Sequence, residues 1–400
     1  MQDIHQRIRD IQHFGEEGGV VPVIDVASTS TFLNPEDMER AFHGEMEGCY
    51  LYSRHSNPSV NMFSKKMAAL EGMEFGLGTA SGMSAISSAL EQIMGDGGEI
   101  ISSLTVYGGT YALFKNVFPQ QGIQVKFVNI EDLQEVERAI TPRTKVIYTE
   151  TLSNPLLRVS PLQKLGDLCR KRNIKLVVDN TFTPMLINPS VFGADVVVHS
   201  CTKFISGASD LIAGVVLSSK KFIHELIDLN HGRIMLKGPV MDPRIAHELY
   251  LRLDHLPIRM KAHSAAAQYF AENVEKAGIK IIYPGLKSHN QHDLMKSMMN
   301  PGYGFGGMMA IDMKESKKAM RLAQRLQDEK FGLYAVSLGF SRTLMSCPSV
   351  STSSEITAED QAKMNLSPGL LRLSIGFVGD HQIMLERFVK CYRECEKHNP

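Results

Sequence analysis

A lysine and an aspartate follow two neighbouring apolar segments in the middle of the chain. Residues 174–179 and 194–200 are Val-rich runs that predict buried strands, the first ending at Asp179 and the second just before Lys203. Such runs are typical of a parallel sheet whose carboxyl edge carries a functional site. A pyridoxal phosphate enzyme needs a lysine that forms a Schiff base and an aspartate that pairs with the pyridinium nitrogen. We therefore expect Lys203 and Asp179 to fill these two roles.

Each residue also has a simpler interpretation. A lysine in a loop is usually a surface residue, and an aspartate after a strand often caps the next turn. An amine is a nucleophile only when neutral, so Lys203 must be buried enough to lower its pKa. Asp179 ends an apolar run, where a carboxylate is unfavourable unless it is paired. The HSCTK and VVDN patterns together favour the catalytic interpretation.

Several residues around these strands are candidates for binding an anion. The SGMS motif at residues 81–84 opens a helix after the small-residue turn GLGTA at residues 76–80. Backbone N–H groups at a helix start bind phosphate well. Ser200 and Thr202 add hydroxyl donors, and Arg54 in LYSRHSNP supplies charge-assisted bonds. Each signal is weak by itself, because many helices begin with Ser-Gly and SNP is an ordinary turn.

Two further side chains suit a substrate. Tyr107 in TVYGGTY is the candidate for stacking on a ring, and its hydroxyl is able to protonate a leaving sulfur. Arg372 lies in the apolar run LLRLSIG, where a guanidinium needs a carboxylate that an amino-acid substrate supplies. A core-facing tyrosine and an internal salt bridge are the alternatives.

The pattern around these residues predicts an α/β fold class. Between about Ser56 and Leu236, strand-like runs alternate with helical segments, which predicts a mostly parallel sheet flanked by helices. One helix is expected to begin at Pro161, with Ser160 as its cap. The strand-like runs are VKFVNI, KVIYTE, IKLVVD, ADVVVHS and AGVVLSS.

The rest of the chain predicts two further units. We expect the irregular residues 1–55 to form an arm, followed by a large α/β domain at residues 56–240. A long helix near residues 243–278, followed by short strands and helices, predicts a smaller α+β domain at residues 241–400. The small and polar residues 346–355 predict a loop near the site.

Composition narrows the function classes. Lys plus Arg and Asp plus Glu both number 43, so neither nucleic acid nor an anionic membrane is an expected partner. The chain has no apolar run of about 18 residues. Its start lacks the apolar segment of a secretory signal. Six cysteines without a CxxC pair indicate reduced thiols in a cytoplasmic protein and no metal site.

The motifs as a set resemble one enzyme family. The chain is similar to the cystathionine and methionine metabolism (trans-sulfuration) enzymes that depend on pyridoxal 5'-phosphate (PLP). The motifs that occur in family order are YSRHSNP, ASGMSAI, YGGTY, ETLSNP, VVDNTF, HSCTKFISG, YPGL, AVSLG and SPGLLRLSIG. The likeness runs from about Ser28 to the C-terminus and implies the PLP-dependent transferase fold type I. Within the family, KFISGASDLIAG and SCPSVSTSSE look most like plant-type methionine γ-lyases.

This resemblance implies a role for each matched residue. Lys203 would bind the cofactor and move protons, Asp179 would pair with its ring nitrogen, and Tyr107 would stack on the ring. The phosphate would be bound by Gly82, Met83, Ser200 and Thr202 of one subunit. Tyr52 and Arg54 would reach the site of a neighbouring subunit, so a homo-oligomer is implied, usually a tetramer built as a dimer of dimers. The substrate would be oriented by Asn154, Ser337 and Arg372. Glu150 and Asn180 lie in matched motifs, with weaker grounds for a role.

Three positions bear on the substrate, which the resemblance implies is a small sulfur amino acid. Leu51, Ala112 and Val336 are apolar where the resemblance places charged residues in relatives that use cystathionine. An apolar pocket suits a methyl thioether and would leave a distal ammonium and carboxylate unpaired. Methionine is therefore favoured, with γ-elimination to methanethiol, 2-oxobutanoate and ammonia as the expected reaction.

Other functions stay open at this point. Bacterial methionine γ-lyases usually have cysteine in place of Gly109 and often histidine in place of Ala208, and Gly109 is shared with synthases and sulfhydrylases. The alternatives are therefore a cystathionine γ-lyase, a cystathionine γ-synthase or an O-acylhomoserine sulfhydrylase. A cofactor-binding protein without turnover is a rival of another class, which an intact set of Lys203, Tyr107 and Arg372 argues against.

Overall fold

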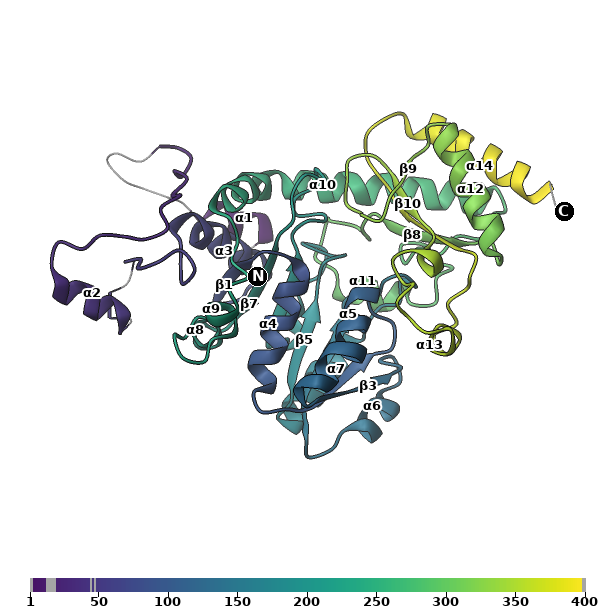
Figure 1. Cartoon of the computed structure of the whole chain (residues 1–400). Helices are drawn as coiled ribbons and strands as arrows, with labels where there is room; N and C mark the ends of the chain where they lie inside the picture. Colours follow the sequence, from purple (N-terminus) through teal and green to yellow (C-terminus); the bar gives the residue numbers. More distant parts are fainter. Residues whose placement is uncertain (1–2, 12–18, 44, 47, 398–400) are drawn as a thin grey trace.

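A seven-stranded sheet lies at the centre of the larger part of the molecule (Figure 1). This is a computed structural model, and the structure describes residues 3–11, 19–43, 45–46 and 48–397. In sheet order, the strands are β1 (Phe75–Thr79), β7 (Gly214–Ser218), β6 (Val196–Ser200), β5 (Lys175–Asp179), β4 (Thr144–Glu150), β2 (Gly98–Ser103) and β3 (Ile123–Val128). The strands from β6 to β3 are parallel, whereas β7 is antiparallel to both β1 and β6. The predicted α/β class with a mostly parallel sheet is confirmed.

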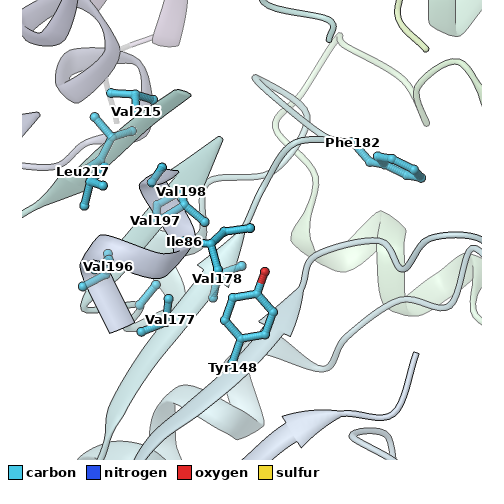
Figure 2. Close-up of a cluster of buried hydrophobic side chains, with 14 of the residues drawn as sticks. Ile86, Tyr148, Val177, Val178, Phe182, Val196, Val197, Val198, Val215 and Leu217 are labelled. Carbon is cyan, nitrogen blue, oxygen red and sulfur yellow. The ribbon is translucent and has the colours of Figure 1, made fainter. Parts of the chain in front are cut away.

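Helices cover this sheet and bury its central strands. Helix α4 packs on β6 and β7, α3 packs on β1, and α7 packs on β5. Figure 2 shows the valines of β5 and β6 gathered beside Ile86 of α4 and Leu217 of β7. The helices of this part are α3 (Pro58–Glu71), α4 (Gly82–Met94), α5 (Gly108–Ala112), α6 (Leu133–Ala139), α7 (Leu162–Arg172), α8 (Lys220–Leu226) and α9 (Arg233–Lys237). Burial on both faces explains why β5 and β6 are continuous apolar runs rather than alternating ones.

A second, four-stranded sheet has its own core. Its order is β8 (Met308–Asp312), β11 (Leu370–Ser374), β10 (Leu344–Ser346) and β9 (Leu333–Tyr334). The apolar sides of α12 (Ser316–Asp328) and α14 (His381–Lys397) contribute Leu322, Leu326 and Phe388 to this core. The remaining helices are α11 (His292–Met298) and α13 (Ala358–Lys363). Short 3-10 or π-helical turns lie at Leu113–Val117, Phe118–Gln121, Pro189–Phe192 and Pro348–Val350.

Helix α10 (Pro243–Lys276) belongs to both cores. The sequence predicts this helix, and it runs for 34 residues with Pro257 inside it. Its earlier buried residues, such as Leu249 and Leu256, join the core of the larger sheet. Its later ones, such as Phe270 and Val274, join the core of the smaller sheet. Figure 1 shows α10 extending from one part of the molecule to the other.

The N-terminal segment is more ordered than the irregular composition predicts. Helix α1 (Ile4–Arg9) buries Ile4 and Ile8 and packs on α3. Helix α2 (Pro35–Phe42) has no buried residue, and Figure 1 shows it extending away from the sheets. Residues 1–2, 12–18, 44 and 47 of the predicted arm lie outside the described residues. The division into three units drawn from the sequence stays a prediction.

Two local predictions are wrong. The GLGTA segment is not a turn, because residues 75–79 form strand β1. Its glycines let the strand pack closely, since a Cβ at Gly76 would lie 2.7 Å from both the Leu217 side chain and the Ser64 carbonyl oxygen. Ser160 is not a helix cap. Helix α7 begins at Leu162, and the Ser160 hydroxyl instead donates to the carbonyl oxygen of Glu150 at 2.7 Å.

The two glycines of β1 provide a test of this packing. We expect Gly76→Ala to lower the free energy of unfolding by about 1–3 kcal/mol, because the Ser64 backbone is unable to move aside. Gly78→Ala is the matched control in the same strand, since its Cβ would meet only the ends of the Met241 and Val60 side chains. Thermal unfolding of both variants checks that Gly76→Ala is the less stable of the two. An equal loss of stability in the two variants would contradict the explanation.

Candidate active site

The carboxyl ends of β4, β5 and β6 border a cavity of about 240 Å³. Residues from the smaller sheet and its loops form the opposite wall. Most of the residues predicted from the sequence line this cavity, namely Gly82, Met83, Tyr107, Asn154, Asp179, Ser200, Thr202, Lys203, Val336 and Arg372. The fold thus brings together residues from widely separated parts of the chain, as the parallel sheet predicts.

Lys203 lies just after β6, with its amine inside this site. Its Nζ donates a hydrogen bond to Ser337 Oγ at 3.4 Å, which brings in Ser337 although that residue is not in the cavity wall. Burial, helped by the positive charge of Arg372, lowers the pKa of Lys203 to about 8. A substantial fraction of the amine is therefore neutral near physiological pH, as a nucleophilic or basic lysine requires.

Two carboxyl groups lie next to each other at the ends of β4 and β5. Glu150 and Asp179 are paired in the parallel register of these strands. Burial raises the pKa of both groups, and for Glu150 the neighbouring charge of Asp179 raises it further. Asp179 accepts a hydrogen bond from the Thr181 N–H at 2.9 Å. Within the described ranges it has no ion pair, so a protonated ring nitrogen would supply the cation that this carboxylate lacks.

The start of α4 provides hydrogen-bond donors at another part of the cavity. Ser81 caps the helix and accepts from the Ser84 N–H at 3.1 Å. The N–H groups of Gly82 and Met83 have no acceptor within the helix and carry the positive end of its dipole. A Cβ at Gly82 would lie 2.6 Å from Ser200 Cβ, so glycine is what allows the helix start to approach β6. These donors and the nearby Ser200 and Thr202 hydroxyls fit a phosphate.

The lysine, the aspartate and these donors together fit PLP. The cavity offers an amine of lowered pKa, a carboxylate for the ring nitrogen and a helix start for the phosphate. Each matches one chemical group of the cofactor.

Arg372, on β11, is a buried cation with spare donors. Its side chain is 2% exposed. It donates to Asn154 Oδ1 at 2.9 Å and to the Ser337 carbonyl oxygen at 3.3 Å. Burial lowers its pKa to about 10. In the part of the chain that the structure describes, no carboxylate forms a salt bridge with Arg372, so the internal salt bridge considered from the sequence is absent. A ligand carboxylate would complete its hydrogen bonding.

Tyr107 lies at the start of α5 and is 39% exposed. Its backbone N–H donates to Glu150 Oε1 at 2.7 Å. Burial, followed by the negative charge of Glu355, raises the pKa of the phenol, so the hydroxyl stays protonated at neutral pH. This state suits an acid that donates a proton.

The cavity wall is also apolar, but not at every position expected. Val336 lines it, whereas Leu51 and Ala112 do not. The apolar wall comes mainly from residues that the sequence analysis did not single out, namely Ile86, Leu152, Phe182, Ile212 and Leu338. Thr352 also lines the cavity, and it belongs to the segment predicted to be a loop near the site.

Tyr52 and Arg54 are separate from this cavity. The Arg54 guanidinium donates to the Met235 carbonyl oxygen at 2.8 Å and lies 5.5 Å from the centre of the Tyr52 ring. Neither residue lines the cavity of its own chain. The structure therefore does not bring them together with Lys203 of the same chain.

A buried polar cluster behind the cavity was not predicted. Glu71 and His199 are both buried, and the Glu71 carboxylate is 2.8 Å from both His199 Nε2 and Asn180 Nδ2. Asn180 follows Asp179 directly, so this cluster holds the ends of β5 and β6. The signal in the sequence is Asn180, a polar residue directly after an apolar strand, and this signal does not identify Glu71 as its partner.

Metal and membrane features are not found in the described part of the chain. It holds no group of three or more His, Cys, Asp or Glu side chains that could bind a metal ion. Among its helices, none combines the length and the apolar character that a membrane crossing requires.

A family model with the description "Cys/Met metabolism PLP-dependent enzyme" matches residues 4–384. The chain belongs to this family. A methionine γ-lyase from Arabidopsis thaliana is 45% identical over 96% of this chain and 89% of its own length. The family resemblance read from the motifs is therefore confirmed, as is dependence on PLP.

Solved structures agree with this assignment. A protein from Campylobacter jejuni, solved with N'-pyridoxyl-lysine-5'-monophosphate, has a TM-score of 0.89 at 26% identity and covers 98% of this chain and 100% of its own. The cystathionine γ-synthase of Xanthomonas oryzae pv. oryzae, in complex with aminoacrylate and cysteine, has a TM-score of 0.89 at 28% identity and covers 100% of both chains. The expected fold type I of PLP enzymes is confirmed.

The lowered pKa of Lys203 predicts how cofactor attachment depends on pH. Only the neutral amine reacts with an aldehyde, so the rate of covalent PLP attachment to the apoprotein should rise as the pH passes upward through about 8. Stopped-flow absorbance at a series of pH values measures this rate. A midpoint near the ordinary pKa of a lysine, about 10.4, would contradict a buried amine.

Proposed function

We propose that this protein is a PLP-dependent carbon–sulfur lyase that acts on L-methionine. The products of γ-elimination would be methanethiol, 2-oxobutanoate and ammonia. One observation carries the proposal: the buried guanidinium of Arg372 faces a cavity whose other wall is apolar around Val336. This combination suits an amino acid with a carboxylate at one end and an uncharged thioether at the other. Identity of 45% to a methionine γ-lyase supports it.

In this proposal each residue of the site has a separate role in the reaction. Arg372 and Asn154 bind the substrate carboxylate, with Ser337 beside them. Bound PLP acts as an electron sink for negative charge that develops on the substrate. Asp179 stabilises the positive charge of the ring nitrogen through its carboxylate. Gly82, Met83, Ser200 and Thr202 hold the phosphate.

Proton transfers in this proposal use two side chains. The neutral amine of Lys203 would remove the α proton of the substrate, give that proton back to the substrate–cofactor system and, neutral again, remove a β proton. The Tyr107 hydroxyl donates its proton to the departing sulfur, because its raised pKa keeps it protonated at neutral pH. A thiolate is a poor leaving group, so this donation is needed for the carbon–sulfur bond to break.

Cystathionine is a poorer fit to the same cavity. Its distal ammonium and carboxylate would meet the apolar wall, where unpaired charges are strongly unfavourable. The structural similarity to a cystathionine γ-synthase keeps γ-replacement as the second candidate. That reaction needs an activated homoserine ester and a thiol, whereas the lyase needs methionine alone.

Incubation with methionine alone tests the proposed function. We expect methanethiol and 2-oxobutanoate to appear in equal amounts, detected by a thiol reagent and a keto-acid assay. Lys203→Ala should retain the fold and lose nearly all turnover, because the base is removed. Product formation only from an acylhomoserine plus a thiol would establish the second candidate instead.

We also propose that the active enzyme is a homo-oligomer, a tetramer built as a dimer of dimers. Tyr52 and Arg54 lie outside the cavity of their own chain, and the arm before them exposes Val20 and Leu33. Large exposed apolar side chains on an extended segment are expected to pack on another subunit. In this arrangement, Tyr52 and Arg54 reach the phosphate of the cofactor in the neighbouring subunit.

A cytoplasmic location is consistent with six free cysteines.

Mixing two inactive variants tests this sharing of residues. Lys203→Ala and Arg54→Ala subunits should each have little activity alone. After joint refolding, about a quarter of the sites should be intact, because half of the dimers are mixed and each mixed dimer has one unaltered site. Size-exclusion chromatography confirms assembly. Absence of recovered activity in properly assembled mixtures would contradict sharing of Arg54 between subunits.

A further inference from the structure

Both oxygens of the Glu150 carboxylate bind backbone N–H groups from different parts of the site. Oε1 accepts from the Tyr107 N–H at 2.7 Å, and Oε2 accepts from the Asn154 N–H at 2.8 Å. Glu150 is only 5% exposed and ends β4. Its carboxylate therefore joins the segment before α5 to the segment after β4.

These two segments carry groups that act at opposite ends of a substrate. Tyr107 presents the hydroxyl for the leaving group. Asn154 accepts a hydrogen bond from Arg372 through Oδ1 at 2.9 Å, so it orients the guanidinium for the carboxylate. Glu150 thus holds the backbones of Tyr107 and Asn154. Protonation of the leaving group depends on the first residue, and orientation of Arg372 for the carboxylate depends on the second.

We propose that Glu150 is a positioning residue that fixes Tyr107 relative to the Asn154–Arg372 pair. This inference rests on the proposed function, because it assumes that Tyr107 protonates the leaving group and that Arg372 binds the carboxylate. Glu150 does not itself transfer a proton in this scheme. It sets the distance between the two groups, and so the substrate length over which both act together.

A carboxylate is the side chain that this geometry requires. Each of its two oxygens offers an acceptor to one backbone N–H group, whether or not the carboxyl group is ionised. A glutamine of the same shape keeps one acceptor but turns an NH₂ group toward the second N–H. Replacement by glutamine should therefore release one segment while leaving the packing nearly unchanged.

Glu150→Gln tests the inference, with Glu99→Gln as a matched control. Glu99 is equally buried at 6% exposure and also hydrogen-bonded, to Lys126 and Thr141, but it does not line the cavity. The first measurement is the absorbance change of the PLP-loaded enzyme on titration with 2-aminobutyrate. This ligand has the carboxylate but no leaving group. We expect its affinity to fall about tenfold or more in Glu150→Gln and to stay near the unaltered value in Glu99→Gln.

A second measurement separates the Tyr107 end from the carboxylate end. Turnover of methionine, whose thiolate needs a proton, is compared with turnover of O-acetylhomoserine, whose acetate leaves without one. In Glu150→Gln the ratio of the methionine rate to the O-acetylhomoserine rate should fall relative to the unaltered enzyme. Weaker binding of the substrate carboxylate alone would lower both rates equally. If Glu150→Gln fails to fold, Glu150→Asp replaces it. This variant keeps both acceptors on a shorter side chain and should show the same two effects at smaller size.

The inference is overturned if Glu150→Gln or Glu150→Asp binds 2-aminobutyrate as Glu99→Gln does and leaves the ratio of rates unchanged. Failure of the proposed function gives a different result. In that case, the unaltered enzyme itself would not release methanethiol from methionine, while the 2-aminobutyrate titration would still report on the link from Glu150 to Arg372.

Discussion

The placement of Glu150 and Asp179 side by side at the ends of β4 and β5 is the constraint on which the rest of the site depends. Two buried carboxylates repel each other and lose the solvation of water, so each requires its own compensation. Glu150 obtains it from two backbone N–H groups. Asp179 accepts from the Thr181 N–H and forms no ion pair within the described residues, which leaves it suited to a positively charged ring. The strand register thus decides where a cofactor of this kind is held.

The smaller sheet supplies the other half of the site. Arg372 comes from β11 and Val336 from the segment after β9. Their approach to Lys203 lowers the pKa of the amine, because burial and a nearby positive charge both disfavour its protonated form. The reactivity of the lysine on one sheet is therefore partly set by an arginine on the other.

Strong local signals made the main site predictable. Asp179 ends an apolar strand, Arg372 lies inside one and Lys203 closely follows one. A charged side chain at such a place is unfavourable unless it has a partner. Strand β1 was missed because its glycines, required for close packing on Leu217 and Ser64, are typical of turns. The antiparallel direction of β7 is not encoded in its composition, since Val-rich runs suit either direction when both faces are covered.

Contacts between distant segments were harder to foresee. The sequence gives no indication that Glu71 pairs with His199, because that contact forms only after the sheets are assembled. For Thr352, the sequence predicts a loop near the site but not which residue of the loop reaches the cavity. Leu51 and Ala112 were expected in the apolar wall, yet other side chains form it. Proximity to a motif along the chain does not fix the direction in which a side chain points.

Helix α10 has a consequence for how the protein loses its structure. Its first half is part of one core and its second half is part of the other. Neither core is able to melt without removing the partner surface of the same continuous helix. Heat or denaturant is therefore expected to disrupt both sheets in one cooperative transition, as for a single folding unit.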